Sequence, residues 1–154
     1  MSDNETREVL VTGLKNAHAM ENQALSIMKP QLSRTENYPV VAAKLGQHIR
    51  ETKGPIVRIE GVLDGLYEDH SSLKDIALSF TGAMAAMGHT MAGDEILKNS
   101  FANFAFENFE IAAYKSLLAL AEAAGYGAAT AALQSNLGEG DGVVARREPC
   151  FGNN

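Results

Sequence analysis

The sequence predicts an all-α protein, an antiparallel bundle of four long helices with an additional short helix. Apolar residues recur at spacings of three and four over most of the chain, which is the helical period. No segment shows the alternation of apolar and polar residues that marks a half-buried strand. The 154 residues can bury one core, so we expect a single domain over residues 1–145 and a flexible tail over 146–154.

Composition limits the classes of function. The chain is 45% hydrophobic and 21% charged, with a formal net charge of −6, as in an ordinary globular protein. It has no basic stripe to neutralise phosphates, so we expect no nucleic acid partner. No apolar run approaches the roughly 20 residues of a membrane span, so we expect no membrane partner. A charged N-terminal segment and a single cysteine, Cys150, favour a cytoplasmic location.

The first half of the chain predicts two long helices. The first covers residues 3–29, with Glu21 on its apolar face and Pro30 as the residue that ends or kinks it. The second runs from about Pro39 to Leu66. Its pattern is interrupted at Gly54-Pro55, where a kink is expected because proline lacks a backbone donor. This helix carries His48 and Glu51, which lie three residues apart near its apolar face.

The second half predicts a short helix and two further long ones. Residues 71–93 carry the short helix and a Met-rich stretch, which we interpret as core or dimer packing rather than a copper site. A long helix is expected from about Asp94, its cap, to Ala124, with Gly125 at the C′ position. The last helix starts near Gly127. Three glycines around Glu139 cost about 1 kcal/mol each, so this helix is expected to be weak or broken there.

The most informative stretch covers residues 101–114 and reads FANFAFENFEIAAY. Glu107 and Glu110 are three residues apart, so their carboxylates leave the helix from the same face. A helix that is apolar on nearly every side is normally buried. Buried glutamates are almost always paired or bound to a metal. Two interpretations remain open: the carboxylates face a metal, or they meet Arg or Lys of a neighbouring helix or a narrow solvated stripe.

Each long helix contributes an acidic residue that could enter the bundle. These residues are Glu21, Glu51, Glu107, Glu110 and Glu139. Five glutamates cannot all be ionised close together in a poorly solvated core, so either protons or cations must neutralise them. Oxygen ligands of this kind suit iron or manganese, with zinc as a common occupant. His48 is a candidate nitrogen ligand beside them.

The chain resembles the YciE/YciF family of bacterial stress-associated proteins, within the ferritin-like superfamily. The resemblance extends from about Leu10 to Glu139. It is carried by GLKNAHAMENQAL, HIRETKGPIVRIEGV, FENFEIAAYKSLLALAEAAG and ALQSNLGE. The third stretch is also similar to the di-iron segment of rubrerythrins. The resemblance implies a ferritin-like bundle, a homodimer and a site for two iron ions, with manganese or zinc as alternatives, at the five glutamates above.

The sequence departs from the usual ferritin-like pattern at two places. A histidine often lies one turn after the ligand glutamates of the second and last helices, whereas Pro55, Gly142 and Val143 stand there in this chain. His48 precedes Glu51 instead of following it. We therefore expect an asymmetric, oxygen-rich site with weaker binding near Glu139.

Two classes of function follow from these features. In the first, the protein binds metal and handles iron or oxidants in a stress response, with weak di-iron oxidase or peroxide-reducing activity. Tyr114, one turn after Glu110, would then be a redox-active, hydrogen-bonding or merely packed group, and packing is the favoured interpretation. In the second, the protein has lost a complete metal site, carries no cofactor and serves as a structural or interaction homodimer.

Overall fold

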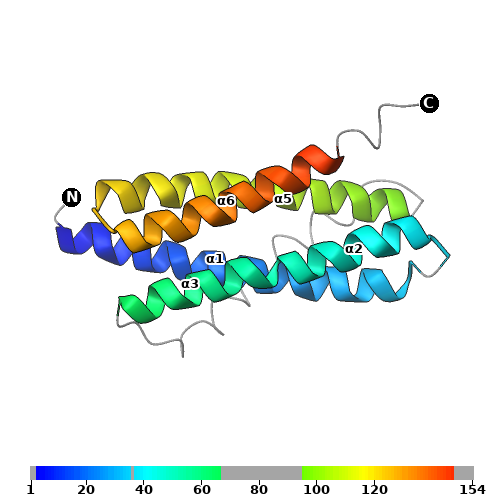
Figure 1. The fold of residues 1–154 in the computed structure, drawn as a ribbon, viewed down its shortest axis with the longest axis horizontal. Helices are drawn as coiled ribbons and strands as arrows, with labels where there is room; N and C mark the ends of the chain where they lie inside the picture. Colours follow the sequence, from blue (N-terminus) through cyan, green and yellow to red (C-terminus); the bar gives the residue numbers. More distant parts are fainter. Residues whose placement is uncertain (1–2, 36, 67–94, 148–154) are drawn as a thin grey trace.

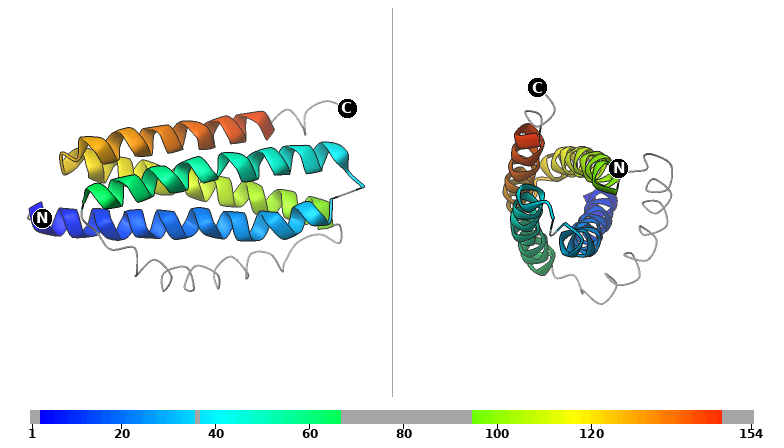
Figure 2. Two further views of the ribbon diagram at one scale, coloured as in Figure 1. Left: turned by 60° about the horizontal axis from the view of Figure 1, so that its bottom comes forward. Right: turned by 90° about the vertical axis from the view of Figure 1, so that its right-hand side faces the viewer.

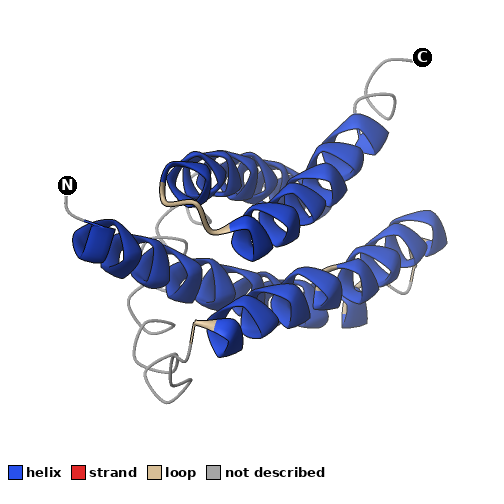
Figure 3. Ribbon diagram, turned by 60° about the vertical axis from the view of Figure 1, so that its left-hand side comes forward, coloured by secondary structure: helices blue, strands red, loops and turns tan. Residues whose placement is uncertain are grey.

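The computed structural model describes residues 3–35, 37–66 and 95–147, and these residues are almost entirely helical (Figure 1). The helices are α1 (Asp3–Ser33), α2 (Pro39–Glu51), α3 (Lys53–Gly65), α5 (Glu95–Ala123) and α6 (Gly127–Arg147). The described part of the chain contains no strand (Figure 3). The predicted all-α bundle is therefore confirmed. The predicted short helix within 71–93 and the Asp94 cap lie outside the described residues.

The helices form a ring of four rods around one core, with α2 and α3 in series as the second rod (Figure 2). α1 packs against α3 and α5, and α6 packs against the same two helices. Arg7 Nη2 donates to the Leu66 carbonyl at 2.7 Å, which places the end of α3 beside the start of α1. Asn103 Nδ2 donates to Gln31 Oε1 at 2.9 Å, which places the start of α5 beside the end of α1. α5 thus runs parallel to α3, which is the arrangement of ferritin-like bundles.

Of the two outcomes predicted at Pro30, an end or a kink, the end does not occur. α1 contains Pro30 and continues to Ser33. Proline removes one helical hydrogen bond and crowds the preceding turn. The extra turn buries Gln31, which is 5% exposed and accepts the bond from Asn103. Contacts with α5 therefore hold a turn that local propensity disfavours.

The predicted interruption of the second helix is confirmed, and it lies one turn before Pro55. α2 ends at Glu51 and α3 begins at Lys53, with Thr52 between them in right-handed helical geometry. Pro55 has no N–H to donate to the carbonyl four residues earlier, which belongs to Glu51. The break therefore falls where the missing hydrogen bond should be accepted, and α3 continues in nearly the same direction as α2 (Figure 1).

α5 ends as predicted, at the C-terminal hairpin. α6 continues through the residues where we expected it to be weak or broken. Gly125 has φ +71°, and the N–H groups of Gly125 and Tyr126 donate to Glu122 and Ala121 at 3.1 and 3.0 Å, which is a Schellman ending. α6 is unbroken through residues 138–142, contrary to our expectation. At Gly140 a Cβ would lie 3.4 Å from Ile111 Cγ1, so packing on α5 offsets the poor helix propensity.

The C-terminal tail was expected to begin at residue 146. α6 instead includes residues 146 and 147. Residues 148–154 lie outside the described part of the chain. None of the described helices is long and apolar enough to cross a membrane.

α1 and α5 approach each other closely at Gly13. A Cβ added there would lie 2.3 Å from Leu117 Cδ2, on a side chain that is itself buried. We expect Gly13→Ala to destabilise the protein by about 1–2 kcal/mol, because overpacking exceeds the gain in helix propensity. Gly61→Ala is the matched control, since nothing lies within 4 Å of a Cβ there, and it should stabilise α3. Urea unfolding of both variants measures this, and equal stabilisation by the two would contradict the close approach.

Candidate functional site

Three of the predicted glutamates lie inside the bundle. Glu21 of α1 is 3% exposed, and Glu107 and Glu110 of α5 are 3% and 7% exposed. Each sits among apolar positions of a long helix, so folding the helix against its neighbours buries the carboxylate as well. An ionised carboxylate in such a place needs hydrogen-bond donors or positive charge close by.

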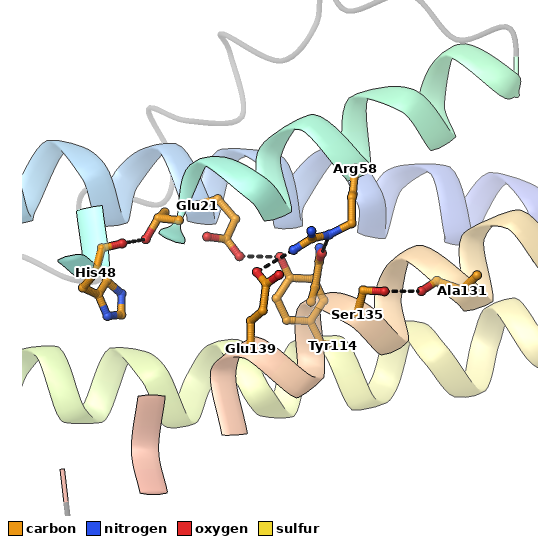
Figure 4. A network of polar contacts seen from close by, with 9 residues as sticks. Glu21, His48, Arg58, Tyr114, Ala131, Ser135 and Glu139 are labelled. Carbon is orange, nitrogen blue, oxygen red and sulfur yellow. Dashed lines mark hydrogen bonds and ion pairs between the residues drawn. The ribbon is translucent and has the colours of Figure 1, made fainter. Parts of the chain in front are cut away.

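Glu21 is held by Tyr114. The Tyr114 hydroxyl donates a hydrogen bond to Glu21 Oε1 across the α1–α5 contact (Figure 4). Burial raises the pKa of Glu21 to about 7, against the lowering effect of the Tyr114 bond; the charges of Glu107 and Glu139 raise it further, and Arg58 lowers it. Glu21 is thus poised between its protonated and ionised forms near neutral pH.

Tyr114 is 3% exposed and keeps its proton. Burial raises its pKa far above the ordinary value, and the negative charges of Glu21 and Glu110 add to this, while the Asn136 side chain partly offsets it. The hydroxyl therefore acts as a permanent donor to Glu21. We favoured a merely packed aromatic; the residue is packed, but it also orients a carboxylate.

Glu107 pairs with His48. His48 Nε2 lies 2.8 Å from Glu107 Oε1, and the two side chains are 10% and 4% exposed. His48 projects from the last turn of α2, where its carbonyl accepts bonds from the Thr52 hydroxyl and N–H, both at 2.9 Å (Figure 4). The break between α2 and α3 therefore also fixes the residue that faces Glu107.

Glu139 pairs with a residue that the sequence analysis did not consider. Arg58 Nη2 lies 2.5 Å from Glu139 Oε2, and Arg58 Nε donates to Asn136 Oδ1, also at 2.5 Å (Figure 4). Asn136 is 2% exposed, whereas the Glu139 side chain is 45% exposed. α6 thus presents an amide and a carboxylate, one turn apart, to a single guanidinium of α3.

Glu51 is half-buried at the end of α2. Its Oε1 accepts a hydrogen bond from Gln47 Nε2 at 2.8 Å, one turn earlier on the same helix. Among the residues that the structure describes, no three His, Cys, Asp or Glu side chains are arranged to hold a metal ion. In this structure Glu107 lies against His48, Glu21 accepts a bond from Tyr114, and Glu139 pairs with Arg58.

The spacing of Arg58 and Asn136, which the sequence analysis did not consider, indicates where they lie. Arg58 lies seven residues after Glu51, which returns to the same helix face, and Asn136 lies three residues after the buried Leu133. Both therefore stand at positions that face the interior. We had kept open the alternative that the carboxylates meet an Arg or Lys of a neighbouring helix. That alternative was stated for Glu107 and Glu110; the structure shows an arginine pair at Glu139 instead, whereas Glu107 faces His48.

The fold and this interior define the class: a ferritin-like four-helix bundle with an acidic centre. The chain belongs to the family described as "Domain of unknown function (DUF892)", whose model matches residues 5–143. Among solved structures, the stress protein YciF of E. coli has a TM-score of 0.76 at 22% identity and covers 94% of this chain and 93% of its own. The family match and this neighbour confirm the resemblance to the YciE/YciF family.

Two other solved structures share the fold. A protein from Xanthomonas campestris is similar with a TM-score of 0.69 and 27% identity, over 94% of this chain and 92% of that one. YcfI from Rhodopseudomonas palustris, whose description proposes a structural role, has a TM-score of 0.70 and 21% identity, over 92% of this chain and 91% of its own. The bundle is therefore matched along nearly its whole length.

Proposed function

We propose that the protein binds an oxygen-preferring divalent metal, iron or manganese ahead of zinc, through Glu21, Glu107 and Glu110. The observation that supports this is the burial of three carboxylates in one interior, one of them with a pKa raised to about 7. A bound cation would relieve the cost of keeping these groups ionised. Carboxylate oxygens are the ligands that iron and manganese accept readily.

The donors around these carboxylates suit such a site. Tyr114 bonds Oε1 of Glu21 and His48 lies against Oε1 of Glu107, so the second oxygen of each carboxylate can contact an ion. Partners of this kind orient ligands and fix their protonation. The side chains must rotate toward one point to bind, because no three of them share one in this structure. His48 could turn its nitrogen to the same ion.

The biological role that we propose is iron or oxidant handling in a stress response, in the cytoplasm, by a homodimer. A bound iron would supply redox chemistry toward O2 or peroxide. The residues of the chain would position Glu21, through the hydrogen bond that the Tyr114 hydroxyl donates to it. The description of YciF as a stress protein supports this role by analogy. The imperfect ligand set predicts turnover that is slow beside that of true ferritins.

A specific observation favours the alternative, a catalytically silent structural or interaction homodimer. Arg58, His48 and Tyr114 already satisfy acidic side chains of the interior. Such a bundle can fold without any metal. The description of YcfI proposes a structural role for that protein, which agrees with this alternative.

Metal titration separates the two proposals. We expect calorimetry with Mn(II), and with Fe(II) under argon, to detect binding that Glu21→Gln and Glu110→Gln weaken by roughly tenfold or more, because each removes a charged ligand. Glu122→Gln is the matched control, since Glu122 is exposed on the same helix as Glu110. Fe(II) oxidation is followed in the same samples. An ordered helical dimer that binds neither ion would establish the structural alternative.

A further inference from the structure

We propose that the Arg58 guanidinium stands in the place of a second cation, so that the bundle takes one metal ion and not a pair. This inference rests on the proposed metal binding and deepens it, because it assigns the stoichiometry and the residue that sets it. Resemblance to ferritin-like proteins implies two ions. The contacts of Arg58 disagree with that implication.

Arg58 occupies the α6 side of the acidic interior. Its two polar contacts, both at 2.5 Å, join it to Glu139 and Asn136 of α6, of which Asn136 is buried and Glu139 is partly exposed (Figure 4). The Arg58 side chain is 30% exposed, so its charge is only partly screened by water.

A second divalent ion on the α6 side would be repelled by the positive charge of Arg58. It would also lack ligands. The guanidinium stays protonated at any accessible pH, so it cannot yield to a metal by losing its proton. Two cations close together in a partly desolvated site repel each other strongly. Glu139 is bound to Arg58, Glu51 accepts a bond from Gln47, and the residue one turn beyond Glu139 is Gly142.

The carboxylates between α1 and α5 have partners of a different kind. Tyr114 holds Glu21 there and His48 lies against Glu107, and neither of these partners carries a permanent charge. Within the described residues, a cation that approaches Glu21 or Glu107 therefore meets Tyr114 and His48 rather than a guanidinium. The weaker binding predicted near Glu139 thus has a cause in the fold, Arg58, rather than in a broken α6.

The test is the number of Mn(II) ions bound per chain, measured by calorimetry and by the electron paramagnetic resonance of free Mn(II). We expect one equivalent for the parent protein and two for Arg58→Gln, with the second lost in the double variant Arg58→Gln/Glu139→Gln. Arg58→Lys keeps the charge and should stay at one. Arg50→Gln is the matched control, because Arg50 is exposed on α2. Circular dichroism establishes that each variant is helical.

The outcomes distinguish this inference from the proposed function. Two equivalents in the parent protein would overturn the role of Arg58 and leave metal binding intact. One equivalent in both the parent and a folded Arg58→Gln would do the same. Should Arg58→Gln fail to fold, two equivalents in Arg58→Lys would overturn the inference and one would support it. No binding by the parent or by any variant would overturn the metal-binding proposal itself, and this inference with it.

Discussion

Replacing His48 by alanine is expected to destabilise the metal-free protein by roughly 3 kcal/mol. The substitution leaves the Glu107 carboxylate buried without the imidazole that lies 2.8 Å from it. Removing one partner of a buried pair costs more than the pair contributes, because the remaining charge has neither water nor a counter-ion. Urea unfolding in the presence of a chelator measures the change.

The chain offers a matched control for this prediction. His18 Nε2 lies 2.8 Å from Glu60 Oε1, the same separation, but the Glu60 side chain is 43% exposed. His18→Ala should therefore cost no more than about 1 kcal/mol. The double variant His48→Ala/Glu107→Gln should recover much of the lost stability, because it removes the buried charge. Equal losses for His48→Ala and His18→Ala would show that burial of the pair is not what matters.

Glu21→Gln is expected to stabilise the metal-free protein above pH 7. The pKa of Glu21 rises from its ordinary value of 4.5 to about 7 on folding, so the folded state prefers the protonated form. The resulting stabilisation is fully present below about pH 4.5 and is lost as the pH rises to 7 and beyond. The loss is on the order of 3 kcal/mol. Glutamine is neutral at every pH and can still accept the Tyr114 hydrogen bond, so it avoids this loss.

The measurement is the free energy of unfolding from pH 5 to pH 8, in chelator, for the parent and Glu21→Gln. Other titrating groups contribute similarly to both proteins, so the difference between the two curves isolates Glu21. We expect that difference to grow across the window. Glu122→Gln, an exposed change on α5, should give a curve parallel to that of the parent. A parallel curve for Glu21→Gln as well would mean that Glu21 ionises normally in the folded state.

The same gain in stability is not expected from Glu107→Gln. Glu107 is not simply one of several like charges, since His48 lies in contact with it. The negative charges of Glu107 and Glu139 instead act on Glu21 and raise its pKa. We therefore expect the gain in stability from a Glu→Gln replacement at Glu21.

The helices could be predicted from the sequence because their signals are local. Apolar spacing, the proline at position 55 and the glycine at position 125 each act within a turn or two of the backbone. The same reasoning failed at Pro30 and at residues 138–142, where α1 and α6 continue. In both places contacts with α5 supply what local propensity lacks: the Asn103–Gln31 bond near Pro30 and the packing of Gly140 on Ile111.

The sequence by itself placed Glu21, Glu107 and Glu110 on apolar helical faces, whose period is local, and so favoured their burial. The tertiary structure alone decided which groups meet them. His48, Tyr114 and Arg58 are separated from their partners by 59, 93 and 81 positions in the chain, and such pairs depend on how the helices rotate and align when they pack. The positions of the acidic residues therefore follow from helical spacing, whereas their partners are decided only when the helices pack.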